Sequence, residues 1–332
     1  MEPQSRTYLD LTGVVSPLGA VRFFELLLGC VTISLVVHWG AYTAPYGMFC
    51  MVVWCLCFSI SILVLVLEVT QLQSCLRISW DNLTATVAVL AVLLCAVASV
   101  VYPLFSLGSN CSRGDCGPRG LRIAATACSC ACCLAYAAEV RFARTRPGHL
   151  PPYMATTPGL LKVTQIFVAG FIFAALSCSR EYAQHAPAVY CAAVYSLCLA
   201  VSTVVVALAV LGKQAVLRLS FERFAAVSSL LAALLYVSTT VVWHISCLDG
   251  RHRDPWRQGG CPHGSCPLDS RMAVAVFTYA NVLLYITDVL SQLPLPTRLV
   301  SQMCLSSLGP RPIIPAQWVL GHVCHNRKSR DV

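Results

Sequence analysis

Long stretches without a charged side chain constrain this fold more than any other feature of the sequence. None of the 42 residues between Glu25 and Glu68 is Asp, Glu, Lys or Arg. Charged residues make up 11% of the 332-residue chain, whereas soluble domains carry roughly 25%. Because most of the exterior of a soluble protein faces water, a chain of this composition lacks the polar surface that it would need. We therefore expect most of the chain to lie in lipid, which excludes a soluble enzyme, a disordered chain and a coiled coil.

Eight apolar segments are long enough to cross a bilayer as helices, which takes about 20 mostly apolar residues. Gly40, Pro45 and Gly47 interrupt the first long run, so that run predicts two helices rather than one. The expected helices lie at about 22–43, 47–69, 83–105, 121–142, 160–180, 187–211, 222–247 and 270–292. We do not interpret the first run as a cleaved signal peptide, because it is long and has a counterpart in the second half of the chain.

The second half of the chain repeats the first. A Leu-Arg-apolar-Ser-aromatic-acid pattern occurs at 76–81 and again at 217–222, before the third and the seventh segment. The fourth and eighth segments also correspond, because Arg122, Ala124, Tyr136, Glu139 and Val140 match Arg271, Ala273, Tyr285, Asp288 and Val289 at one common spacing. Each half holds four helices, an even number, so the repeat is parallel rather than inverted. The sequence predicts an all-α integral membrane protein with two tandem four-helix bundles.

Basic residues favour an orientation with the N- and C-termini in the cytoplasm. In that orientation 15 Lys and Arg residues lie inside and 8 lie outside, in line with the excess of basic residues in cytoplasmic loops. The net charge of +9 therefore does not indicate nucleic-acid binding. We expect a cytoplasmic N-terminal segment at 1–16, a first unit at 17–154, a second unit at 155–292 and a flexible cytoplasmic tail at 293–332.

Two loops on the expected outer side each contain a Cys-x4-Cys element, Cys111 with Cys116 and Cys261 with Cys266. Disulfides persist in the oxidising extracellular compartment, so we expect a bridge within each loop. Such a loop could form a contact surface, or its bridge could only stabilise a turn rich in Gly and Pro. Asn110 begins a sequon and is a candidate glycosylation site, although a bridged Cys111 beside it would hinder the transferase.

Residues that could carry chemistry are scarce in the expected helices. Glu25, Glu68, Glu139, Lys162 and Asp288 lie near cytoplasmic helix ends, and Arg122 and Arg271 lie near outer ends. We expect their side chains to extend to the membrane interface, which leaves no buried charge. The deepest polar group is that of Asn281, which we expect to bond to a neighbouring helix rather than to a substrate.

No motif in the sequence indicates a catalytic or metal site. Cys128, Cys130, Cys132 and Cys133 lie within a turn and a half of one helix and point in several directions, whereas zinc needs converging ligands. Zinc-peptidase, nucleophile-elbow and P-loop motifs do not occur. We therefore expect no enzymatic activity, no cofactor and no bound metal. Cys75, beside the membrane on the expected inner side, is a candidate palmitoylation site.

Several motifs resemble one family. The runs RTRPG at 144–148 and YMATTPGLLKV at 153–163 resemble the hinge between the two MARVEL domains of the myeloid-associated differentiation marker family. The two Cys-x4-Cys loops, the LRISW element and the FTY run before Asn281 resemble the same family. The resemblance covers about residues 7–291, in order and at matching spacing, and the tail beyond Ser291 does not share it. It implies a multi-pass protein associated with cholesterol-rich membrane domains, vesicle traffic and cell junctions, with no catalytic residues to carry over.

These observations predict a non-catalytic protein that organises membrane domains or scaffolds partners. It would act through helix faces that contact membrane lipids, including those of cholesterol-rich domains, or other membrane proteins. The alternative is a transporter or channel subunit, which would need broken helices and polar midplane residues, and the sequence shows neither. The expected location is the plasma membrane or secretory and endosomal vesicles.

Overall fold

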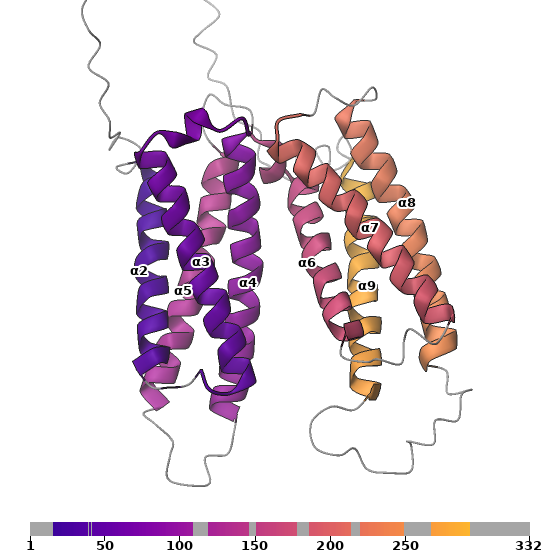
Figure 1. The fold of residues 1–332 in the computed structure, drawn as a ribbon, viewed down its shortest axis with the longest axis horizontal. Coiled ribbons are helices and arrows are strands. Elements are labelled where there is room, and N and C mark those ends of the chain that lie inside the picture. Colours follow the sequence, from indigo (N-terminus) through magenta and orange to yellow (C-terminus); the bar gives the residue numbers. More distant parts are fainter. Residues whose placement is uncertain are drawn as a thin grey trace, which may run out of the picture. The chain divides into compact units, whose positions relative to one another are not determined.

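The computed structural model describes residues 16–38, 40, 42–108, 119–145, 151–177, 186–213, 220–248 and 267–292. Eight of the helices within these residues are long and apolar enough to cross a membrane, which confirms the predicted fold class (Figure 1). They are α2 (Pro17–His38), α3 (Pro45–Val69), α4 (Trp80–Gly108), α5 (Arg119–Arg144), α6 (Thr157–Ser177), α7 (Ala186–Val210), α8 (Phe221–Trp243) and α9 (Pro267–Gln292).

Proline and glycine determine where the first helices begin and end. Pro17 and Pro45 open α2 and α3, where the missing backbone N–H costs no hydrogen bond. The turn between these helices places Gly40 at a φ of 68°, a conformation that side chains with a Cβ rarely adopt. The first helix therefore runs from Pro17 to His38 rather than over the predicted 22–43. This shift places Arg22 and Glu25 inside the helix and not at its start.

The eight helices form two four-helix bundles. In the first bundle α2 and α4 each pack against α3 and α5, and in the second bundle α6 and α8 each pack against α7 and α9 (Figure 1). Helices with the same place in the two halves thus have the same neighbours. The structure therefore confirms the predicted tandem arrangement of two four-helix units.

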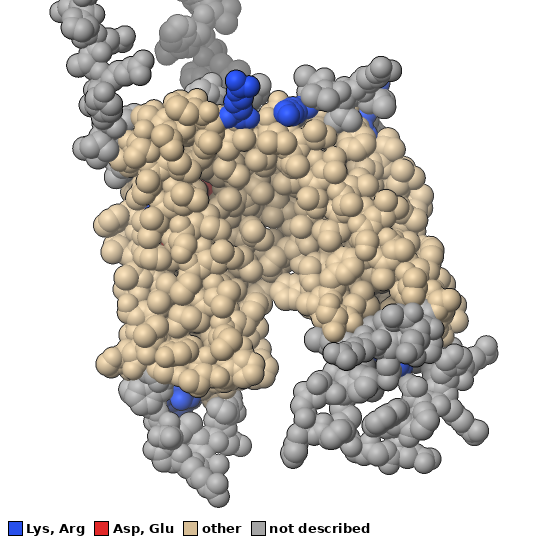
Figure 2. Space-filling view, viewed as in Figure 1, with Lys and Arg blue, Asp and Glu red and all other residues tan. Residues whose placement is uncertain are grey.

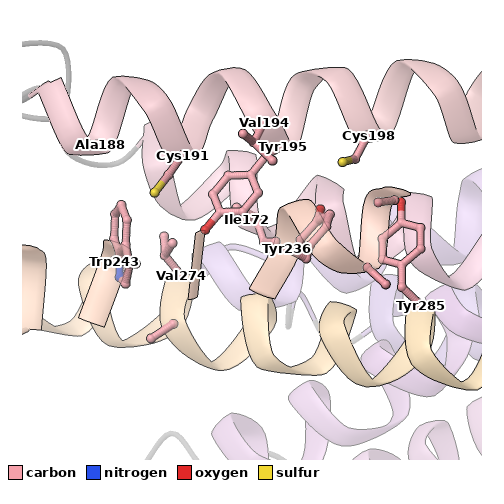
Figure 3. Close-up of a cluster of buried hydrophobic side chains, with 13 residues drawn as sticks. Ile172, Ala188, Cys191, Val194, Tyr195, Cys198, Tyr236, Trp243, Val274 and Tyr285 are labelled. Carbon is pink, nitrogen blue, oxygen red and sulfur yellow. The ribbon is translucent and has the colours of Figure 1, made fainter. Parts of the chain in front are cut away.

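Aromatic side chains fill the centre of the second bundle. Tyr236 lies between Tyr195 and Tyr285, with ring centroids 5.4 Å and 5.1 Å away, and Trp243 continues the row toward the end of α8 (Figure 3). Such ring pairs contribute about 0.5–1.5 kcal/mol beyond the burial of their surface. Because lipid tails are as apolar as the core, van der Waals packing and hydrogen bonds hold membrane helices together, and this row supplies the packing.

The outward-facing surface of both bundles is apolar. Its exposed large side chains come from seven of the eight helices and include Phe24, Val52, Leu104, Leu134, Leu197, Leu234 and Leu283, whereas no large apolar side chain of α6 is exposed. Figure 2 shows one face as a broad surface almost without acidic or basic side chains, with Lys and Arg near its two ends. This is the surface of a multi-pass membrane protein, for which lipid is the solvent.

A further group of buried side chains connects the two bundles. It includes Ala85 and Val89 of α4, Met154 of the short helix η2 (Tyr153–Ala155) and Val205 of α7. The residues that the structure describes belong to one compact unit. The predicted tail at 293–332 lies outside the described residues, as does the predicted N-terminal segment up to residue 15.

Candidate functional site

A group of charged side chains lies inside the first bundle. The Arg22 Nε donates to Glu139 Oε1 at 2.6 Å, and the Arg22 Nη1 donates to Glu68 Oε2. Trp80 Nε1 donates to the second oxygen of Glu68 at 2.9 Å, so all four helices of the bundle contribute. Arg22 and Glu139 are only 3% and 8% exposed. Arg22 follows Pro17 by five residues, about 7–8 Å along the helix, so the ion pair lies within the bundle rather than at its rim.

Glu25 lies beside this ion pair because residues three apart share a helix face. Its side chain is 1% exposed. Ser61 Oγ donates to Glu25 Oε2 at 3.4 Å, and the Ser61 hydroxyl is 2.8 Å from that of Tyr136. Glu25 Oε1 accepts no hydrogen bond from any described residue. Arg22, Glu25, Glu68 and Glu139 are called the first ion cluster below.

A small pocket adjoins the first ion cluster. Its lining is Arg22, Glu25, Ser61, Val64, Thr84, Val87, Tyr136 and Glu139. The free space is about that of a single water molecule. The pocket is therefore too small for an organic substrate, although its polar lining suits a bound water.

The second bundle contains a corresponding cluster. Lys162 Nζ and Asp288 Oδ2 are 3.2 Å apart, and their side chains are 1% and 0% exposed. Lys162 Nζ donates to Ser229 Oγ at 2.8 Å, and Ser229 Oγ donates to Asp288 Oδ2 at 2.9 Å. Gln165 Nε2 donates to the same Asp288 oxygen at 3.2 Å. Lys162, Gln165, Ser229 and Asp288 are called the second ion cluster, in which one ammonium balances one carboxylate.

The two ion clusters occupy equivalent places in the repeat. The equivalent residues are Arg22 and Lys162, Glu25 and Gln165, Glu139 and Asp288, and Tyr136 and Tyr285. The first two pairs are separated by 140 residues and the last two by 149, because the loops of the two halves differ in length. The duplication has therefore kept a buried cation and its carboxylate partner in both bundles.

Hydrogen bonds nearer the middle of the bundles repeat as well. They join Ser61 to Tyr136 at 2.8 Å, Ser202 to Tyr285 at 3.0 Å, Trp54 to Ser129 at 3.0 Å and Tyr195 to Thr278 at 2.9 Å. In each bundle they connect the second helix to the fourth. These polar groups therefore bond one another across helices.

Asn281 is the polar residue for which we predicted a bond to a neighbouring helix. Its Nδ2 donates to the Tyr236 hydroxyl of α8 at 2.9 Å and to the Gln165 carbonyl of α6 at 3.4 Å. The prediction is confirmed.

The expectation that the charged side chains extend to the interface is wrong. The buried residues of α2 are Arg22, Glu25, Gly29, Thr32, Val36 and Gly19. Most of them recur every three or four positions and form the face that packs on α3 and α5, so both charged side chains point into the bundle. The internal repeat could have indicated these buried charges. In both halves a basic residue is followed three residues later by Glu or Gln, and Glu139 matches Asp288.

Hydrogen bonds from Asn82 join the two bundles. Its Oδ1 accepts from the Met154 backbone N–H at 3.0 Å, and its Nδ2 donates to the Ala209 carbonyl at 3.3 Å. Nearby, the Ser79 N–H donates to the Val210 carbonyl at 2.8 Å. These bonds link α4 to η2 and α7, and they give the joint between the bundles a defined geometry.

The residues predicted for modification fall into two groups. Cys111, Cys116, Cys261, Cys266 and Asn110 lie outside the described residues, so the two disulfides and the glycosylation stay predictions. Cys75 has a free, exposed thiol at the end of the short helix η1 (Leu72–Cys75), next to exposed Leu76. This position suits palmitoylation, which also stays a prediction.

Metal ligands do not gather among the residues that the structure describes, where no group of three or more His, Cys, Asp or Glu side chains could hold an ion. In α5 the Cys132 thiol is buried, that of Cys130 is exposed, and those of Cys128 and Cys133 are half-buried. These four thiols therefore point in different directions, as their spacing predicts.

Comparison with known proteins agrees with the duplicated architecture. The model of the MARVEL family, a membrane-associating domain, matches residues 13–142 and 153–291. The chain is 46% identical over 291 residues to myeloid-associated differentiation marker-like protein 2 of Rattus norvegicus and of Homo sapiens, a match that covers 87% of this chain and 95% of each relative. It is 38% identical over 290 residues to myeloid-associated differentiation marker of Homo sapiens, covering 83% of this chain and 87% of the relative.

No solved structure shows significant similarity to the chain. The two matched segments each contain four of the apolar helices, and the relatives match over nearly their whole length. This multi-pass membrane protein, with its two tandem four-helix units, therefore belongs to the MARVEL family and resembles the myeloid-associated differentiation marker proteins within it.

Proposed function

We propose that this protein organises membrane domains or scaffolds partner proteins, and that it does so without catalysis. The observation that carries the proposal is that charged side chains lie inside the bundles and large apolar side chains lie on their outer surface. The charged side chains of both ion clusters bond inward, while seven of the eight helices expose large apolar side chains on the outer surface. A protein built in this way interacts with its surroundings through helix faces, which contact lipid or the helices of other proteins.

The joint at Asn82 supports this proposal. Hydrogen bonds from Asn82 to Met154 and Ala209 couple the two bundles at defined positions. Eight helices coupled in this way offer more lateral surface than one four-helix bundle. Such a surface suits a protein that collects particular lipids or membrane partners around itself.

The alternative function, a transporter or channel subunit, rests on the buried charges, since ionisable groups within membrane helices often mark a transport path. Two observations speak against it. Lys162 and Asp288 are hydrogen-bonded to Ser229 and Gln165, and the pocket beside Glu25 has room for about one water molecule. The clusters therefore fit a structural role better than a path for solutes.

The proposal includes an orientation and a location. Both termini would be cytoplasmic, as the distribution of Lys and Arg favours. The protein would reside in the plasma membrane or in secretory and endosomal vesicles. Its lipid partners would be those of cholesterol-rich domains, which is consistent with a membrane-associating family.

Plasma-membrane vesicles that separate into ordered and disordered phases provide the test. The tagged full-length chain is expressed at several levels, and its share in the ordered phase is measured together with a fluorescent reporter of lipid order. We expect enrichment in the ordered phase and a change in lipid order that grows with expression. Exclusion from the ordered phase without an effect on lipid order, together with solute flux in proteoliposomes, would instead support the transporter alternative.

A further inference from the structure

The first ion cluster contains more acid than base. Arg22 is its single cation, whereas Glu25, Glu68 and Glu139 are three carboxyl groups. Glu68 is 23% exposed, so part of its charge reaches solvent. Arg22 and Glu139 then balance each other in the interior, and an ionised Glu25 would add an uncompensated buried charge, which is costly in a low-dielectric environment.

Among the residues that the structure describes, none supplies a second cation near Glu25. The titratable groups that face Glu25 are Arg22 on its own helix and Cys132, Tyr136 and Glu139 on α5, while Glu68 of α3 is bonded to Arg22. From α4 the neutral side chain of Thr84 lines the adjoining pocket. The one hydrogen bond donated to the Glu25 carboxyl group by a described side chain is that of Ser61, at 3.4 Å.

Glu25 and Glu139 both line one pocket whose free space is about that of a single water molecule, which brings their carboxyl groups close together. Two ionised carboxylates have no hydrogen to place between them, so such a contact is favourable only when one of the two carries a proton. Glu139 already accepts a hydrogen bond from Arg22 Nε, and Glu25 Oε1 has no donor among the described residues. The proton therefore belongs on Glu25, which can then donate to Glu139.

The second bundle shows the same contact with a permanent hydrogen. Gln165, the equivalent of Glu25, donates from Nε2 to Oδ2 of Asp288, the equivalent of Glu139, at 3.2 Å. The amide N–H of Gln165 occupies the role that an O–H of Glu25 would have. Gln is the neutral isostere of a protonated Glu. The Gln165–Asp288 contact therefore shows the arrangement expected for a protonated Glu25 beside Glu139.

We propose that Glu25 is a proton-binding site, at which Glu25 and Glu139 share one proton beside a pocket for a single water molecule. The ligand is a proton, and no atom other than this proton enters or leaves. The site makes the first bundle responsive to pH, because loss of the proton leaves two adjacent carboxylates inside it. The second bundle lacks this response, since the amide hydrogen of Gln165 does not dissociate.

Infrared difference spectroscopy on the full-length chain in lipid nanodiscs tests the proposal. We expect the C=O stretching band of a protonated carboxyl group in the wild type at neutral pH, its loss in Glu25→Gln, and its persistence in Glu222→Gln, which removes an exposed carboxylate. The band should also disappear when the pH is raised far enough to remove the proton. Absence of the band from the wild type, or its persistence in Glu25→Gln, would overturn the proposal.

Gln165→Glu provides a second variant that does not depend on the folding of Glu25→Gln. It places a carboxyl group beside Asp288, and we expect a second protonated-carboxyl band to appear. Absence of that additional band in a folded variant would contradict the argument from the repeat. A sodium-dependent rise in the thermal midpoint of the wild type at constant ionic strength would show that a metal cation, and not a proton, balances Glu25.

Discussion

Lys162 and Asp288 form an ion pair with a distance of 3.2 Å between Nζ and Oδ2, and neither side chain is more than 1% exposed. Removing one partner from a buried pair leaves the other charge without compensation. We expect Lys162→Met to lower the free energy of unfolding by about 3–5 kcal/mol. Denaturation of the detergent-solubilised protein measures this loss, and Lys213→Met, at an exposed lysine, should have little effect. Equal stability of the two variants would show that the pair is not structural.

Gly159 lies where the chain enters the second bundle. A Cβ there would lie 2.3 Å from the Tyr153 carbonyl oxygen and 2.6 Å from the Met154 Cα. We expect Gly159→Ala to destabilise the protein by about 1–3 kcal/mol, because backbone atoms must move. Gly170→Ala is the matched control, since nothing lies within 4 Å of its Cβ. A thermal midpoint of Gly159→Ala at or above that of Gly170→Ala would refute the tight contact.

Asn82 provides the polar contacts of the joint between the bundles. In Asn82→Ala the Met154 N–H and the Ala209 carbonyl lose their bonds to this side chain, at a cost of about 1–3 kcal/mol for a buried group without a partner. We expect faster amide hydrogen exchange at Met154. Thr203→Val, which removes a hydroxyl that bonds within its own helix, should leave that exchange unchanged. Unaltered exchange in Asn82→Ala would show that the joint does not depend on this residue.

Cys75 is the exposed thiol that we expect to be palmitoylated. Cys75→Ser should abolish the mass shift that acyl exchange produces in the cellular protein, because the thiol is at a helix end beside exposed Leu76. Cys55→Ser serves as the control, since Cys55 is also exposed but lies in the middle of α3. Retention of the shift in Cys75→Ser would assign the modification to another residue.

The sequence was sufficient to predict the eight helices, their tandem arrangement and the bond of Asn281 to a neighbouring helix, because apolar length and internal repetition are local features of the chain. It did not reveal the direction of Arg22, Glu25, Lys162 and Asp288. The direction of each side chain depends on which face of its helix packs inward. It also depends on whether a neighbouring helix places an opposite charge at the same depth in the bundle. The bounds of α2 also differed, because Pro17 allows the helix to begin before its first apolar run.

The central claim is that the outer surface acts on the membrane, while the buried Lys162–Asp288 pair serves only to hold the second bundle together. The double variant Lys162→Met, Asp288→Leu replaces a buried pair by apolar side chains, a change that is often neutral or stabilising. Its share in the ordered phase of separated plasma-membrane vesicles is the most direct measurement. We predict the same share as for the wild type, because the outer faces are unchanged. Loss of ordered-phase enrichment in this variant, with its stability preserved, would contradict the claim and place the activity inside the bundles.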